Sequence, residues 1–220
     1  MNRLSDTRER ILSAAERLFA SGGVTTTSLR TITDNARVNL AAVSYHFGSK
    51  DGLIEAVYRR RLGPLSRRQL DNLDRLEAQA GEHPLELCHI VEAFILPFAE
   101  LDVASPEEAE VYSRLLAQTY GEAGSYFERI FSDEYSNLFT RYKKALHRAL
   151  PELAPDLLCM RLHFLMGALN HTLAGAHLRR FMDATAARQS LDQALRQLVP
   201  FLVAGLQAST EIARPPATTA

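Results

Sequence analysis

The stretch Thr27–Lys50, TSLRTITDNARVNLAAVSYHFGSK, decides the fold predicted for this chain. It contains two short helical patterns separated by a tight connection. Thr27 or Ser28 can cap the first helix, in which Leu29 and Ile32 fall on one apolar face. Two helices joined by a turn of three or four residues form a helix-turn-helix, whose second helix enters the major groove of DNA.

The second helix of this pair is predicted over residues 40–47. Asn39 can cap it, and Val43 and Phe47 then face inward four residues apart. Ser49 is in position to cap a further helix that begins at Lys50. Three successive helix starts within so short a stretch indicate a small helical unit.

These residues resemble the DNA-binding domain of TetR-type transcriptional regulators. Tyr45-His46-Phe47, Ser49-Lys50 and Leu53 are similar to the signature that closes that domain, and Thr27-Ser28-Leu29-Arg30 with Ile32 is similar to its second helix. The resemblance covers about residues 6–60. It implies a helix-turn-helix domain that binds double-stranded DNA, followed by a helical domain that binds an effector and dimerises.

The turn departs from the family pattern. Asp34-Asn35-Ala36-Arg37 ends the first helix and Val38 is expected to be buried, but family members usually place Gly where this chain has Arg37. A left-handed backbone at a side-chain-bearing residue costs ~1–2 kcal/mol. Either the turn differs slightly, or another contact offsets the strain.

The fold class expected is all-α, because no stretch has the alternation of a strand. A three-helix DNA-binding domain is predicted over residues 1–62, a helical effector-binding and dimerisation domain over 63–208, and a disordered, Pro/Thr/Ala-rich tail over 209–220. Gly63-Pro64 marks the boundary, because proline disfavours helix at the residue before it.

The remaining helices follow from apolar periodicity, caps and prolines. Residues 1–5 are expected to fray, and the first helix to run from Asp6 or Thr7 to Gly22-Gly23. Pro97 and Pro200 should each bend a helix. Helices are predicted over 50–62, from 65 past 76, and over 84–101, 105–120, 125–150, 156–181 and 186–207. The helix over 156–181 is apolar nearly all round and is therefore expected to be buried on most sides.

Charge is distributed unevenly along the chain. Residues 1–68 hold 12 Lys and Arg against 6 Asp and Glu, whereas the remaining residues hold 13 against 20. A basic N-terminal part on an acidic body suits an N-terminus that meets phosphate, although a charge run can also be a plain solvated face. No signal peptide is recognised and the apolar run 157–169 is too short to span a membrane, so a soluble, cytoplasmic protein is expected.

The predicted recognition helix has few side chains that can make bidentate hydrogen bonds to bases. Leu40, Ala41 and Ala42 can contact thymine methyls, although the alanines can equally serve as clearance against the groove. Lys50 offers a charge and free helix amides to a phosphate. The candidate DNA-binding residues are Thr27, Ser28, Arg30, Arg37, Asn39, Leu40, Ala41, Ala42, Ser44, Tyr45, His46 and Lys50.

The resemblance implies an effector cavity among the middle helices. RLHFLMGALNHTLAG (161–175) and LVPFLVAGLQA (198–208) look like a TetR subgroup that answers acyl-chain ligands. The pocket candidates are Phe94, Phe98, Tyr112, Leu115, Gln118, Phe127, Phe131, His163, Phe164 and Asn170, with Arg114, Arg161 and His171 as further polar candidates. For most of the aromatic residues, packed core is the more frequent role.

The last two helices carry more apolar surface than one body of this size can cover, which predicts a two-fold homodimer. Small residues in a stripe allow two helices to approach closely. The dimer-interface candidates are Gly167, Ala174, Gly175, Leu191, Leu195, Leu198 and Leu202.

An enzyme is disfavoured, and no cofactor or metal is expected. Glu86 and His89 form the sole Glu-x-x-His pair, whereas a di-iron bundle needs two. The chain has no Gly-rich phosphate loop and no nucleophile elbow. The function expected is a repressor that binds an inverted-repeat operator as a homodimer and is released by a small hydrophobic effector. The alternatives are a helical carrier of a hydrophobic ligand without DNA activity and, as a third, a bundle enzyme.

Overall fold

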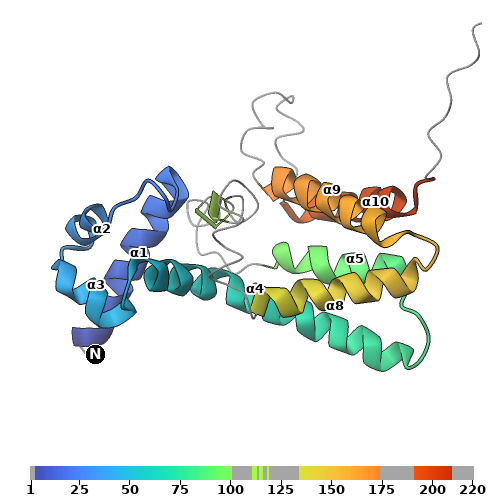
Figure 1. Ribbon diagram of the computed structural model, residues 1–220, viewed down its shortest axis with the longest axis horizontal. Coiled ribbons are helices and arrows are strands. Elements are labelled where there is room, and N and C mark those ends of the chain that lie inside the picture. The colour runs from blue at the N-terminus through green and yellow to red at the C-terminus, as the bar shows by residue number, and fades with distance from the viewer. Residues whose placement is uncertain are drawn as a thin grey trace, which may run out of the picture.

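The computed structural model describes residues 3–100, 111, 112, 114, 115, 118, 134–173 and 191–209. These residues form helices joined by turns and contain no strand, as the sequence predicts. The elements are α1 Arg3–Gly22, α2 Leu29–Ala36, α3 Leu40–Phe47, α4 Lys50–Ala80, α5 Leu87–Ile95, the 3₁₀ turn η1 Leu96–Phe98, α8 Glu134–Ala149, α9 Pro155–Leu173 and α10 Leu191–Gln207. Figure 1 shows α1–α3 at one end, α5, α8, α9 and α10 at the other, and α4 reaching from one group into the other.

Three side-chain caps set the starts of α2, α3 and α4. The Ser28 hydroxyl, the Asn39 amide oxygen and the Ser49 hydroxyl each accept a hydrogen bond from the amide three residues further on. The donor–acceptor distances are 3.1, 2.9 and 3.0 Å. Each cap satisfies an amide that has no partner within its own helix, which confirms the three predicted helix starts.

The N-terminal helices pack around one core. Leu53, Ile54 and Val57 of α4 are fully buried in this core. The other fully buried members are Ile11, Ala15, Phe19, Ile32 and Val43. Gly23, at φ +86, follows the last residue of α1 and lets the chain turn where the sequence predicts a stop.

The start predicted for the first helix was wrong, because α1 begins at Arg3 and not at Asp6 or Thr7. Asp6 lies in the first turn of α1, where a carboxylate stabilises the positive end of the helix dipole. No Pro or Gly stands between residues 3 and 6 to stop the helix earlier.

The predicted break at Gly63-Pro64 was also wrong, because α4 passes through Pro64 without interruption. Proline inside a helix removes one backbone hydrogen bond and costs about 3 kcal/mol. Leu62 and Leu65 are buried on either side of it, and Leu73 is fully buried two turns further on. Each buried leucine contributes about 1.5–3 kcal/mol, so packing outweighs the local cost. A domain boundary after residue 62 stays a prediction.

Polar contacts, one of them from the buried Gln69, connect α4 to the body. Gln69, only 2 % exposed, donates its amide N–H to the Phe94 carbonyl of α5 at 2.8 Å. The main-chain carbonyl of Gln69 accepts a hydrogen bond from the hydroxyl of Tyr142 on α8 at 2.8 Å. Arg141 of α8 forms an ion pair with Asp74 of α4 at 2.6 Å. These contacts hold α4, α5 and α8 in one arrangement.

Two further helix predictions need correction. The helix predicted from residue 84 begins at Leu87, and Glu86 makes no side-chain cap hydrogen bond there. Pro97 lies in the 3₁₀ turn η1 that follows α5 and does not bend a longer helix. Residues 111, 112, 114, 115 and 118, within the helix predicted over 105–120, are helical. Residues 125–133, 174–181 and 186–190 of the other predicted helices, with 210–220 of the predicted tail, lie outside the described residues.

The helix-turn-helix turn contains the strain foreseen at Arg37. This residue has φ 53° and ψ 50°, which is left-handed backbone, and it is the sole non-Gly residue of positive φ in the described part of the chain. The Nη2 amino group of Arg10 on α1 donates to the carbonyls of Ala36 and Arg37, at 2.6 and 2.9 Å. A cation at the carbonyl end of a helix is stabilising, so Arg10 offsets part of the strain.

We expect Arg37→Gly to raise the free energy of unfolding by about 0.5–1 kcal/mol. The left-handed backbone costs a side-chain-bearing residue ~1–2 kcal/mol, while glycine loses ~0.5–1 kcal/mol through its freer unfolded chain. Urea unfolding measures the difference. Arg10→Met is the companion variant and should lower stability, because it removes the guanidinium from both carbonyls. A decrease in stability for Arg37→Gly would contradict this account of the turn.

Candidate functional sites

The outward face of α3 is the candidate DNA-recognition surface. Leu40 and Tyr45 are 54 % and 74 % exposed, and Ala41 and Ser44 are also exposed. These four residues recur at spacings of three and four and therefore lie on one side of the helix. Val43, on the opposite side, is fully buried and anchors α3 to the core. Ala42 is half-buried at the edge of the face.

The flanks of α3 carry the polar candidates. Arg30 and Arg37 are exposed on α2 and at the turn, and Ser28 is exposed but occupied as the cap of α2. His46 is half-buried, with its ring 5.0 Å from the ring of Tyr45 in an edge-on arrangement.

Thr27 does not reach the surface. Its side chain is only 7 % exposed, and its hydroxyl donates to the Gly23 carbonyl at 2.7 Å. The interpretation of Thr27 as a DNA-backbone contact is therefore not supported by its position, because its hydroxyl closes the loop between α1 and α2.

Lys50 is the first residue of α4, beside the amides at the start of that helix. Its ammonium group lies 3.5 Å from the Thr25 carbonyl, so the side chain bridges the α1–α2 loop and α4. Partial burial lowers the pKa of Lys50, and the neighbouring Asp51 carboxylate opposes that shift. Positive charge at the N-terminus of a helix suits a single phosphate.

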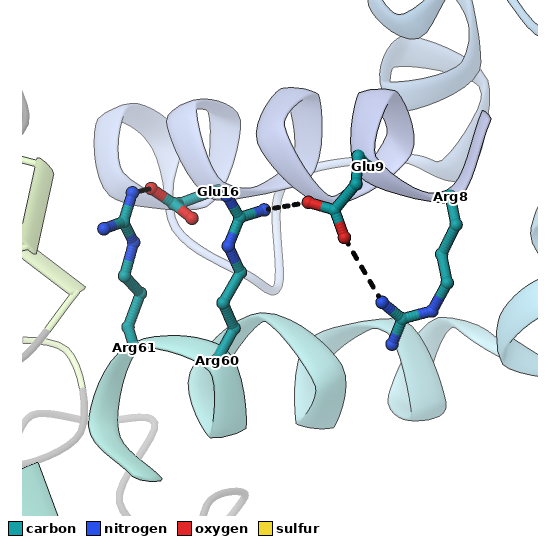
Figure 2. A network of polar contacts seen from close by, with 5 residues as sticks. All are labelled: Arg8, Glu9, Glu16, Arg60 and Arg61. Carbon is teal, nitrogen blue, oxygen red and sulfur yellow. Dashed lines mark hydrogen bonds and ion pairs between the residues drawn. The ribbon is translucent and has the colours of Figure 1, made fainter. Parts of the chain in front are cut away.

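Ion pairs connect α1 to α4 (Figure 2). Glu9 pairs with Arg60 at 3.1 Å and with Arg8 at 3.5 Å. Glu16, which lies further along α1 and is 5 % exposed, pairs with Arg61. The exposed pairs contribute little, whereas removing one partner of a buried pair such as Glu16–Arg61 is strongly destabilising.

An apolar pocket lies between α5, α8 and α9 in the body. The ring of Phe94 lies 5.0 Å from that of Tyr142 and 6.2 Å from that of Phe139 at this pocket. The lining residues are Ile90, Val91, Phe94, Ile95, Phe139, Tyr142, Lys143, Leu146, Leu162, Leu165 and Met166. Lys143 is the one charged residue among them, and its side chain is exposed.

Of the predicted pocket residues, only Phe94 lines this pocket. Phe98, Tyr112 and Leu115 are buried core residues, and Asn170 is half-buried. His163 and Phe164 point outward, with Phe164 64 % exposed, so their assignment to this pocket was wrong. Phe127 and Phe131 lie outside the described residues.

Sequence reasoning missed Phe139, Tyr142, Lys143 and Leu146. These residues recur along α8 at spacings of three and four, which was a usable signal for a shared helix face. Their partner Met166 carried no such signal, because α9 is apolar on several sides. Arg161, a further polar candidate, donates to the carbonyls of Leu206 and Ala208 at 2.5 and 2.6 Å and joins α9 to the end of α10.

Gln118 connects the body to the DNA-binding end and does not line the pocket. Its amide N–H donates to the Phe19 carbonyl of α1 at 2.7 Å, and its amide oxygen lies 3.5 Å from the hydroxyl of Tyr58 on α4. Burial raises the pKa of Tyr58, which keeps the phenol neutral and able to donate. One side chain of the body therefore contacts two helices of the N-terminal unit.

One face of α9 and α10 is uncovered in the single chain, contrary to the expectation that α9 is buried on most sides. Met160 and Phe164 of α9 and Phe201 of α10 are 54 %, 64 % and 68 % exposed. Gly167 is also exposed, and Leu191 is 38 % exposed.

Leu195, Leu198 and Leu202 were wrong as dimer-interface residues, because they are buried within their own chain. These leucines form one apolar face of α10, which packs on the core of the same chain. Their helical spacing predicts an apolar face but does not show whether that face packs on the same chain or on a partner chain. Ala174 and Gly175 lie outside the described residues.

Neither a metal site nor a membrane span is present in the described residues. In the part of the chain that the structure describes, no group of three or more His, Cys, Asp or Glu side chains could hold a metal ion. Among the helices so described, none has the length and apolarity needed to cross a membrane.

Two family models match the chain. Residues 11–57 match bacterial regulatory proteins of the tetR family, and residues 92–205 match the tetracyclin repressor-like C-terminal domain. The first match contains α2, α3 and the start of α4, and the second contains α8, α9, α10 up to residue 205 and part of α5. No curated protein matches the chain.

Solved structures share the fold at low sequence identity. A HlyIIR mutant is 20 % identical with a TM-score of 0.58, covering 95 % of this chain and 100 % of its own. The SmeT–triclosan complex is 20 % identical with a TM-score of 0.55, covering 95 % and 98 %. The fatty acid degradation regulator FadR from Bacillus halodurans is 12 % identical with a TM-score of 0.51, covering 92 % and 97 %.

We expect Lys50→Ala to weaken binding to all DNA sequences about equally. The slope of log affinity against log salt should fall by about 1, because the variant neutralises one phosphate fewer. Binding titrations on two unrelated duplexes at several salt concentrations measure both effects. Lys144→Ala, an exposed lysine of α8 at the other end of the molecule, is the control and should leave the slope unchanged. Weaker binding to only one of the two duplexes would contradict a phosphate contact.

Proposed function

The chain belongs to the TetR family of bacterial regulatory proteins and is a DNA-binding transcriptional regulator, and we propose that it is a repressor released from its operator by a hydrophobic small molecule. The exposed face of α3, which the Asn39 cap and the buried Val43 hold in place, is the observation that supports DNA binding most directly. Lys50, Arg30 and Arg37 flank this face with positive charge suited to phosphates.

A homodimer completes the proposed DNA-binding unit. The uncovered apolar side chains Met160, Phe164 and Phe201 form a surface of the kind that another protein chain covers. Gly167 on α9 and Gly205 on α10 are both exposed, and a Cβ added at either would meet no atom within 4 Å. A second copy can therefore approach these helices closely. Two-fold symmetry presents two α3 helices, which suits an inverted-repeat operator.

The pocket between α5, α8 and α9 supports an apolar effector. Its lining is hydrocarbon and aromatic ring apart from Lys143, so it has few groups that can hydrogen-bond a polar ligand. An acyl chain with its polar end toward the exposed Lys143 is our first candidate, and an aromatic compound is the second. One of the similar folds was solved as a complex with triclosan, so an effector site is a reasonable expectation for this architecture.

Gln118 offers a route from effector to DNA. It holds the carbonyl of Phe19 and lies beside the hydroxyl of Tyr58, while the buried Gln69 ties α4 to α5 and α8 around the pocket. An effector that favours a different packing of the body can act through these contacts on α1 and α4. It must bind that conformation more tightly than the DNA-bound one, because only differential affinity shifts an equilibrium.

We expect Gly167→Glu to give monomers that bind the operator weakly, because a desolvated charge would face the partner helix. The absence of any atom near the added Cβ means that the single chain should still fold. Analytical ultracentrifugation at micromolar concentration measures the effect. Gly63→Glu is the matched control, a helical glycine of α4 with room for a side chain, and should stay dimeric. A wild-type protein that is monomeric at this concentration would exclude the dimer.

We expect fatty acids, acyl-CoA esters or apolar aromatic compounds to release the operator-bound protein, and two variants to separate binding from coupling. Met166→Trp should fill the pocket and abolish effector binding while DNA binding remains. Gln118→Leu should keep both binding events but reduce the coupling between them, which is typically about 5- to 150-fold in affinity. Calorimetry and DNA titration with and without effector measure these quantities.

If no compound of these classes binds, or if binders leave DNA affinity unchanged, the apolar-effector proposal fails. A protein that binds such a compound but never binds DNA would instead support the alternative of a helical carrier. Weaker effector binding by Gln118→Leu would assign this residue to ligand binding and contradict its role in coupling.

A further inference from the structure

We propose that this regulator distinguishes its operator chiefly through the methyl groups of thymines, and that Leu40 is the residue that contacts them. The inference rests on the proposed function, in which α3 lies in the major groove, and adds what α3 recognises there. It is based on the exposed apolar side chain that α3 has at its start and on the hydrogen-bonding side chains that α3 lacks.

The recognition helix lacks the side chains that usually read bases by hydrogen bonds. From Asn39 to Ser49 the sequence contains no Arg, Lys, Gln, Asp or Glu. Arg or Lys paired with guanine and Asn or Gln paired with adenine are the common bidentate contacts. On the exposed face of α3 itself, Ser44 and the Tyr45 hydroxyl are the polar groups that remain, and neither can make the two-hydrogen-bond contact that identifies a base pair.

Asn39, whose side chain has the required chemistry, is occupied. Its amide oxygen accepts the Ala42 amide hydrogen at 2.9 Å and thereby starts α3. A bidentate contact with adenine needs that oxygen and the amide nitrogen together. Asn39 would have to give up the cap, which is worth about 1 kcal/mol to a helix, before it could read adenine in this way.

Leu40 has the position and the exposure of a methyl reader. It is the first residue of α3, and the N-terminal residues of a recognition helix are the ones that contact base edges. Its side chain is 54 % exposed although leucine is usually buried. The neighbouring Ala41 is exposed and small, so the start of α3 can come close to the base edges.

In the major groove the thymine C5 methyl is the apolar group that separates a T·A pair from the others. A leucine side chain that covers this methyl removes both from water, and one buried methyl corresponds to about 0.8 kcal/mol, or about 4-fold in affinity. Arg37 lies at the turn before α3, where its exposed side chain can hold a phosphate beside these base pairs. The basic flanks then supply affinity, and Leu40 supplies the discrimination.

Replacement of thymine by deoxyuridine tests the proposal directly, because it removes the methyl and leaves every hydrogen-bonding group of the base pair unchanged. A binding sequence is first selected from random duplexes with the full-length protein, and each thymine is then replaced symmetrically in both half-sites. At one thymine position we expect the affinity to fall about 15-fold, which is the 4-fold effect of one methyl in each half-site.

The Leu40→Ala variant tests which residue covers the methyl. It should bind the thymine duplex more weakly than wild type, and at that same position it should be nearly indifferent to uracil. Lys50→Ala is the matched control, since removal of a phosphate-binding charge should weaken both duplexes equally and preserve the full effect of uracil. Circular dichroism checks that the folded helix content is unchanged, as expected for an exposed side chain.

Tight binding to a selected sequence that is insensitive to uracil at every position would overturn methyl recognition and leave DNA-binding regulation intact. Undiminished sensitivity to uracil in Leu40→Ala would overturn the assignment to Leu40. Failure to select any sequence would overturn both this inference and the proposed function.

Discussion

The structure depends on one helix, α4, whose buried side chains join the N-terminal helices and the body in one continuous core. Its first turns carry Leu53, Ile54 and Val57, which are fully buried under α1–α3, and its later turns carry Leu65 and Leu73, which are buried in the body. Because a helix is stiff over this length, α1–α3 have a defined orientation relative to the body, as α4 reaches from one group of helices into the other (Figure 1). Pro64 removes one backbone hydrogen bond between the buried Leu62 and Leu65, so packing on both sides of it keeps α4 continuous.

Ion pairs and hydrogen bonds act together with apolar burial to set the arrangement of the helices. Ion pairs join α1 directly to α4. Gln118 of the body contacts both of these helices, at the Phe19 carbonyl and the Tyr58 hydroxyl. The contacts of Gln69 join α4 to α5 and α8 of the body. Polar side chains in these places specify one arrangement among several that apolar packing alone would allow. A regulator that must switch between two arrangements gains from such specific contacts, since each is either made or broken.

Local chemistry made the helix-turn-helix predictable. Ser28, Asn39 and Ser49 act within three residues of themselves, so their roles follow from sequence without knowledge of the rest of the molecule. Pro64 was misjudged because its local cost is outweighed by leucines whose burial depends on distant helices. Phe164 was wrongly assigned to the pocket and Leu195 to the dimer interface for a related reason. Helical spacing shows that a face is apolar, but whether that face meets its own chain or another is decided by tertiary packing.

The hydrogen bond from Gln118 to the Phe19 carbonyl joins residues 99 positions apart in the chain. During synthesis the helix-turn-helix leaves the ribosome long before residue 118 does, so any structure that it forms at that stage lacks this contact. Its early form relies on the local caps and on the core beneath α1. Ordering the body afterwards closes a long loop, which makes this junction a late event in folding. The contact between the body and α1 can therefore form only after most of the body has been synthesised.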